Sequence, residues 1–85
     1  MTQFTYTIQD PNGIHARPAG LLVKAAQGFS SSIRLTKGEK AADLKRLFAL
    51  MGLNVKQGDT VTLTAEGPDE AQAVSALEAF FRENL

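Results

Sequence analysis

Residues 2–27 have the sequence TQFTYTIQDPNGIHARPAGLLVKAAQ, and within this stretch the spacing of the apolar residues changes. Thr2 to Gln9 alternates in the way that is typical of a half-buried strand, and one face carries Phe4, Tyr6 and Ile8. Asp10 to Gly13 is rich in turn-forming residues. The following segment has helical spacing, and its apolar face is formed by Ala19, Leu22, Val23 and Ala26. The stretch therefore predicts a strand, a turn and a helix.

The rest of the chain repeats these two patterns. Alternating apolar residues predict strands at Ser32–Thr36, Ala41–Asp43 and Thr60–Ala65. A hairpin turn at residues 37–40 joins the first two of these strands. The last segment predicts a helix with Asp69 as its N-cap. The apolar positions of this helix are Ala73, Val74, Leu77, Phe80 and Phe81.

The segment Leu44–Gly52 predicts a nine-residue helix that is apolar on several sides. Leu44, Leu47, Phe48 and Met51 fit one helical face, while Leu50 lies on another. A short helix of this kind cannot bury all of its apolar area against one sheet, so we expect part of it to be exposed. Exposed apolar patches often mark contact sites, although a well-buried short helix is an equal alternative.

The order βαββαβα predicts an α+β fold in one domain, residues 1–85. The first helix joins two strands that run in the same direction, and the fourth strand fits between them as in a split βαβ unit. Helices should cover one face of an antiparallel sheet and leave the other face, rich in threonine, in water.

Composition excludes several classes of protein. The net charge is zero, which disfavours a general nucleic-acid binder. No cysteine is present, which fits a reducing cytoplasm, and no signal peptide or membrane-inserted segment is evident. The charge is uneven, because residues 13–56 hold eight Lys/Arg and two acidic residues. This basic half is either a solvated face or a surface for acidic partners and phosphate.

His15, the only histidine, stands where the turn meets the first helix. A helix N-terminus has free N–H groups and a positive dipole end, which favour an anion such as phosphate. The guanidinium of Arg17 adds charge-assisted donors, and an imidazole can act as a nucleophile. An ordinary surface or capping histidine is the alternative. One histidine without cysteine makes a poor metal site, and no set of residues for nucleophilic hydrolysis is visible.

The run Gly13–Pro18 resembles the active-site signature of the HPr family, the histidine-containing phosphocarriers of the bacterial phosphoenolpyruvate-dependent sugar phosphotransferase system. The resemblance covers essentially the whole chain. It includes the helix Pro18–Gln27, the apolar segment Lys45–Gly52 and the turn 65–67 before a C-terminal helix. The resemblance implies an open-faced β-sandwich of strand order 1-4-2-3 with three helices on one face. It also implies that the first helix starts at Ala16 with His15 as its cap, whereas the effect of proline on its preceding residue favours a start at Pro18.

The resemblance further implies a function. His15 would accept a phosphoryl group on Nδ1 from phosphorylated Enzyme I and pass it to a sugar-specific Enzyme IIA. Arg17 would stabilise the charge, and the amides of Ala16 and Arg17 would cap the phosphate. The partner-docking residues would be Gly20, Leu21, Lys24, Leu47, Phe48 and Met51. The protein would be a cytoplasmic, monomeric carrier without a cofactor or a metal, and not an enzyme by itself.

Two alternatives keep the same fold but change the output. A regulatory phosphocarrier, such as the nitrogen-related branch, would act by protein binding rather than through sugar transport, and a small phosphatase would turn over. One position departs from the family pattern. Members from low-GC Gram-positive bacteria carry a kinase-regulated serine where this chain has Arg46, so regulation of that kind is in doubt.

Overall fold

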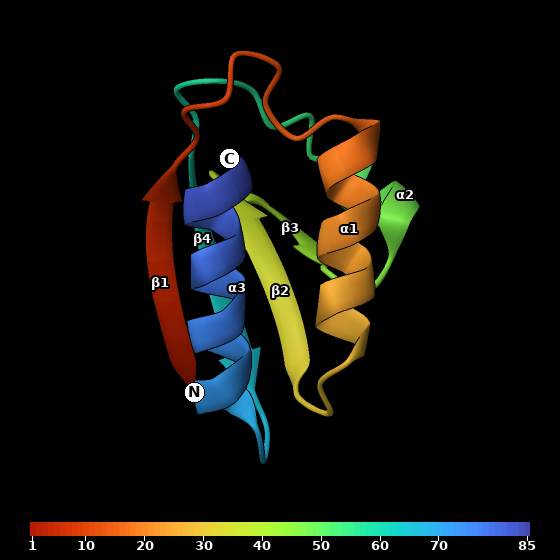
Figure 1. Ribbon diagram of the computed structural model, residues 1–85, viewed down its shortest axis with the longest axis vertical. Coiled ribbons are helices and arrows are strands. Elements are labelled where there is room, and N and C mark those ends of the chain that lie inside the picture. The colour runs from red at the N-terminus through yellow and green to blue at the C-terminus, as the bar shows by residue number, and fades with distance from the viewer.

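Four antiparallel strands form one sheet in the order β1-β4-β2-β3, with the helices on one of its faces (Figure 1). The computed structural model describes all residues, Met1–Leu85. Its elements, in chain order, are β1 (Thr2–Thr7), α1 (Ala16–Gln27), β2 (Ser32–Lys37), β3 (Lys40–Asp43), α2 (Leu47–Gly52), β4 (Thr60–Glu66) and α3 (Glu70–Asn84). The open-faced α+β fold, its strand order and its three helices are therefore confirmed.

The strand pairing separates an apolar face of the sheet from a polar one. Phe4 lies opposite Leu63, which lies opposite Leu35, so one row across three strands faces the core. The next row presents Thr5, Thr62 and Thr36 to solvent. The alternation expected from the sequence thus produces one buried face and one face rich in threonine.

The helices bury the apolar face of the sheet. Helix α3 packs on β1 and β4, while α1 contacts both α3 and α2. Phe81 of α3 is fully buried, and its ring packs edge-to-face against Phe4 and Tyr6 with centroids 5.4 and 5.6 Å apart. Such aromatic pairs contribute about 0.5–1.5 kcal/mol each beyond the burial of their area. All four residues expected on the apolar face of α1 are buried.

Several expected boundaries were wrong. Strand β1 ends at Thr7 because the amides of Ile8 and Gln9 turn away to bond with the Asp59 and Leu85 carbonyls. Strand β3 begins one residue earlier and β4 ends one residue later than the alternation suggested.

Helix α2 also differs from the prediction. It begins at Leu47, whereas Leu44 precedes it and bonds through its amide to the Ile33 carbonyl. Leu44 and Leu50 are the buried members of this segment, although helical spacing placed them on different faces. A short apolar run has too few turns to define its buried side from sequence.

Candidate functional site

The turn before α1 holds His15 in place through backbone bonds. The Asn12 amide donates to Asp10 Oδ1 (2.8 Å), and the Gly13 amide donates to the Asp10 carbonyl (2.9 Å). Gly13 has φ +63°, and a Cβ there would lie 2.4 Å from the Val55 carbonyl oxygen. This position therefore requires glycine, because the second loop passes directly against it. The amide of the buried Ile14 then donates to the same Val55 carbonyl (3.1 Å).

His15 is the N-cap of α1, and its side chain is exposed. Its carbonyl accepts the first helical bond from the Ala19 amide (3.0 Å), while its imidazole makes no capping bond. The amides of Ala16 and Arg17 have no backbone partner, as the first amides of a helix do not. Pro18 has no amide hydrogen to satisfy and fits the first turn. The helix start that the resemblance implied is confirmed.

A shallow pocket of about 300 Å³ lies at this helix end. Its lining consists of His15, Arg17, Pro18, Leu21 and Asn84. Arg17 makes no ion pair or hydrogen bond with the protein, and no acidic side chain lines the pocket. His15 and Arg17 therefore line a pocket that suits an anion, at a helix end whose first amides are free.

Asn84 is the pocket residue that the sequence did not identify. It lies in the last turn of α3, which ends beside the start of α1 at the upper end of the molecule (Figure 1). The carbonyl of the buried Leu85 accepts bonds from the Gln9 amide (2.6 Å) and the Asp10 amide (2.9 Å). These bonds attach the end of α3 to the loop that carries His15. No local pattern around Asn84 indicates this contact.

The structure leaves several of the expected docking residues exposed on α1 and α2, which pack against each other. Phe48 is 88% exposed, Leu21 51% and Met51 39%. Lys24 is exposed as well, while Gly20 and Leu47 are half-buried. The expectation that part of this apolar area stays exposed is confirmed. We call Leu21, Leu47, Phe48 and Met51 the apolar surface.

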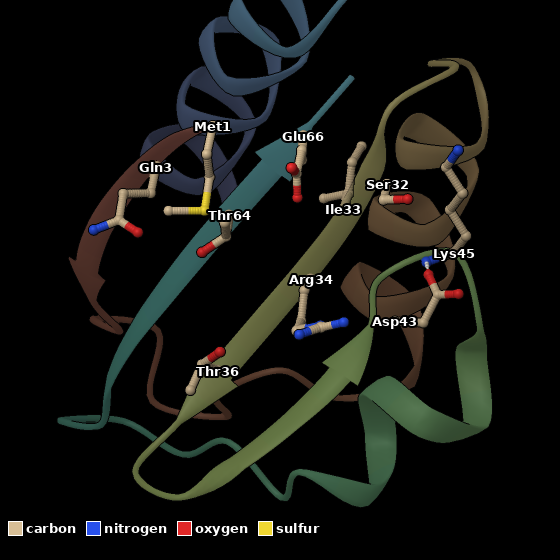
Figure 2. A pocket seen from close by; sticks show the side chains of 10 residues that line it. All are labelled: Met1, Gln3, Ser32, Ile33, Arg34, Thr36, Asp43, Lys45, Thr64 and Glu66. Carbon is tan, nitrogen blue, oxygen red and sulfur yellow. Dashed lines mark hydrogen bonds between the residues drawn. The ribbon is translucent and has the colours of Figure 1, made fainter.

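A larger hollow, about 450 Å³, lies over the polar face of the sheet, away from His15. Figure 2 shows Arg34 at its centre, with Asp43 and Lys45 on one side and Glu66 on the other. Arg34 lies opposite Asp43 in the register, yet the two form no ion pair, and Asp43 Oδ1 accepts a bond from the Lys45 amide (2.9 Å). The hollow mixes both signs of charge and contains no nucleophilic pair.

No group of three or more His, Asp, Glu or Cys side chains is arranged to hold a metal ion. No helix has both the length and the apolar character needed to span a membrane.

Comparison with known proteins identifies the family. The family model for the PTS HPr component phosphorylation site matches residues 2–83. Phosphocarrier protein HPr from Lysinibacillus sphaericus is 50% identical over 78 residues, which is 92% of this chain and 89% of that protein. The chain belongs to the HPr family, the phosphocarriers of the phosphotransferase system.

Solved structures agree with this assignment. The histidine-containing phosphocarrier protein from Mycoplasma has a TM-score of 0.94 at 36% identity, over 96% of this chain and 93% of that one. Crh, a catabolite repression protein from Bacillus subtilis, has a TM-score of 0.78 at 38% identity, over 100% of this chain and 98% of its own. That crystal structure of Crh is a domain-swapped dimer, so the family contains proteins that are not monomers.

Proposed function

We propose that this chain accepts a phosphoryl group on Nδ1 of His15 from phosphorylated Enzyme I and delivers it to a sugar-specific Enzyme IIA in the cytoplasm. The observation that supports this most is the unbonded, exposed imidazole at the start of α1, with the free guanidinium of Arg17 in the same pocket. Membership of the HPr family makes phosphoryl transfer the appropriate chemistry for these parts.

The transfer would require only a nucleophilic ring nitrogen and a few hydrogen-bond donors from the carrier. The bond between phosphorus and the donor breaks as the bond to the unprotonated Nδ1 of His15 forms, and the other ring nitrogen keeps its proton. The new phosphoryl oxygens would receive hydrogen bonds from the Ala16 and Arg17 amides and from the Arg17 guanidinium. Delivery to the acceptor reverses these steps, so the carrier ends each cycle unchanged.

The apolar surface, together with Gly20 and Lys24, would dock the partners. A Cβ built on Gly20 meets nothing within 4 Å, so the space beside the helix is open. Phe48 projects into solvent from a short helix, and aromatic residues in this setting often dominate binding energy. Lys24 adds a positive charge that suits an acidic partner surface. The monomer would present this surface to one partner at a time.

The test uses phosphoenolpyruvate, Mg²⁺ and Enzyme I with wild-type protein and with His15→Ala. We expect one acid-labile phosphoryl group per wild-type chain and none on the variant, which should keep its melting temperature. Stoichiometric phosphorylation of His15→Ala would assign the acceptor to another residue. Continued release of inorganic phosphate by the wild type would indicate a phosphatase instead.

A regulatory phosphocarrier is the second candidate, and the likeness to Crh favours it. Its output would be binding of a regulatory partner rather than sugar uptake. Arg46 occupies the N-cap of α2 and is exposed, so this chain offers no hydroxyl at that position for a serine kinase. Transfer from the phosphorylated protein to an Enzyme IIA separates the two functions, since a purely regulatory protein would retain its phosphoryl group.

A further inference from the structure

The pocket at His15 has one wall that does not come from α1. Four of its five lining residues lie in or next to the first turns of that helix, and the fifth is Asn84 at the end of α3. Asn84 is the only polar residue of the lining that lies outside the run Gly13–Pro18. A group bonded to His15 would therefore lie between α1 and Asn84.

Asn84 is held in a defined orientation. Its Nδ2 donates to the Phe80 carbonyl one helical turn earlier (3.0 Å). The bonds from the Gln9 and Asp10 amides to the Leu85 carbonyl fix the backbone next to it. One N–H of the carboxamide and its Oδ1 have no partner in the protein. The free donor is thus positioned before any ligand arrives, which reduces the cost of ordering it.

The charge of the pocket makes a neutral donor useful at this point. The end of α3 is the negative end of its dipole, which by itself disfavours a phosphoryl group nearby. A side-chain N–H offsets that field without adding a charge. An acidic residue at the same position would repel a phosphoryl dianion and would compete with it for Arg17.

We propose that Asn84 is a third element of the phosphoryl-binding site, with its free N–H donating to an oxygen of the group carried on His15. The phosphoryl group has three terminal oxygens, and three sets of donors surround it. These are the Ala16 and Arg17 amides, the Arg17 guanidinium and the Asn84 carboxamide. The proposal rests on the proposed function, because it requires a phosphoryl group on His15.

The experiment compares wild type with Asn84→Ala and Asn84→Asp. Each protein is phosphorylated by Enzyme I and, separately, by phosphoramidate, a small donor that loses ammonia as its phosphoryl group moves to the imidazole. The readouts are the ³¹P chemical shift of phosphorylated His15 and its rate of hydrolysis, neither of which a purely structural role would change. The matched controls are Gln72→Ala and Gln72→Asp, the same kinds of change at an exposed amide in the first turn of α3.

We expect Asn84→Ala to shift the ³¹P signal and to speed hydrolysis roughly 2- to 10-fold, the effect of one hydrogen bond. Asn84→Asp should have the larger effect, and the Gln72 controls should match wild type. Unchanged signals and rates in both Asn84 variants would overturn the proposal while leaving the carrier function in place. If wild type takes up no phosphoryl group from either donor, the function itself fails and Asn84 loses this role with it. Should Asn84→Ala not fold, Asn84→Asp decides by the same readouts.

Discussion

At the end of the molecule where β1 and α3 begin, hydrogen-bond donors surround the carboxylates of Asp69 and Glu70 (Figure 1). At the opposite end, the side chains of His15 and Arg17 have no partner in the protein. Asp69 accepts bonds from the Ser30 amide (2.8 Å), the Ser31 amide (2.9 Å) and the Ser31 hydroxyl. We call the first the closed end, formed by Ser30, Ser31, Gly67, Asp69 and Glu70, and the second the open end, formed by His15, Arg17 and Asn84.

Glu70 completes the closed end. It accepts bonds from the Thr2 hydroxyl (2.6 Å), the Met1 amine (2.9 Å) and the Gly67 amide (3.3 Å). Gly67 has φ +154°, and a Cβ there would lie 2.7 Å from Ser31 Cα, so the two turns approach as closely as glycine allows. Side-chain bonds of this kind stabilise the fold, and a site for an exchangeable group must leave its donors free. If the proposed function is right, the closed end serves stability and the open end serves phosphoryl transfer.

The largest effect that we predict is loss of stability in acid, and two of the three carboxyl groups whose pKa is lowered lie at the closed end, the third being Asp59. Bonds from the Thr2 hydroxyl and the Met1 amine lower the pKa of Glu70 to about 2, and the Ser31 hydroxyl and Ser30 amide lower the pKa of Asp69. Both groups bind protons more readily when the chain is unfolded. Their contribution is complete above the ordinary carboxyl pKa and is lost as the pH falls toward the folded value.

Melting curves should show this directly. We expect a nearly constant melting temperature from pH 7 to 5 and a fall of roughly 10 °C or more between pH 4.5 and 2.5, for all carboxylates together. Glu70→Gln should flatten the lower part of this curve. An equally steep curve in the variant would remove Glu70 from the explanation.

Asp69→Ala should be the next largest change. It removes the acceptor of three bonds and should lower the melting temperature by roughly 5–10 °C. Phosphoryl uptake by the folded protein should be unchanged. The control is Glu78→Ala, which breaks only the exposed pair with Arg82 (3.2 Å) and should have little effect. Slower phosphoryl uptake in Asp69→Ala would show that the two ends are coupled.

Asp69 also shows what could be predicted from the sequence. Hydrophobic periodicity located the strands and the buried face of α1, although several strand ends were misplaced. The split βαβ unit indicated a place for the fourth strand between the first two, while the full strand order and the start of α1 at Ala16 came from the family resemblance. Asp69 is the N-cap of α3, as predicted, but its side chain makes no capping bond there. Its partners, Ser30 and Ser31, lie in a distant turn, and no local pattern encodes which turns meet.

The same reason explains which residues of the candidate site could be predicted from the sequence. His15 and Arg17 share a short motif, so their proximity follows from the sequence. Asn84 completes the pocket from the other end of the chain, and only the packing of α3 brings it there. In α2 helical spacing placed Leu50 on a different face from Leu47, Phe48 and Met51 but did not show which face is buried, because the helix is too short for periodicity to decide.

Arg17→Ala should slow phosphoryl transfer and leave stability unchanged, which is the opposite of what we expect for Asp69→Ala. The guanidinium has no partner in the protein, so its loss should leave the melting temperature unchanged within about 2 °C. Phosphoryl transfer from Enzyme I should slow roughly 10- to 100-fold, as expected for charge-assisted bonds to the moving group. Arg17→Lys should recover only part of this rate, because lysine lacks the planar fork. The control is Lys40→Ala, which removes an exposed positive charge in β3. Equal transfer rates for wild type, both Arg17 variants and the control would make Arg17 an ordinary surface charge.

The smallest predicted effect concerns Phe48, and it extends the comparison to α2. Phe48 is 88% exposed, while Leu50, two residues on, is 1% exposed. Truncating a buried leucine typically costs about 2–5 kcal/mol, so Leu50→Ala should lower the free energy of unfolding by that amount. Phe48→Ala should lower it by less than about 0.5 kcal/mol.

If Phe48 docks Enzyme I, its loss should weaken binding about 10-fold, since aromatic residues at contact sites often contribute more than 1 kcal/mol. Folded Leu50→Ala should bind almost as wild type does. One denaturation curve and one titration for each variant measure both quantities. A stability loss in Phe48→Ala with unchanged affinity would reverse the assignment, placing Phe48 with the structural residues and leaving the docking surface elsewhere.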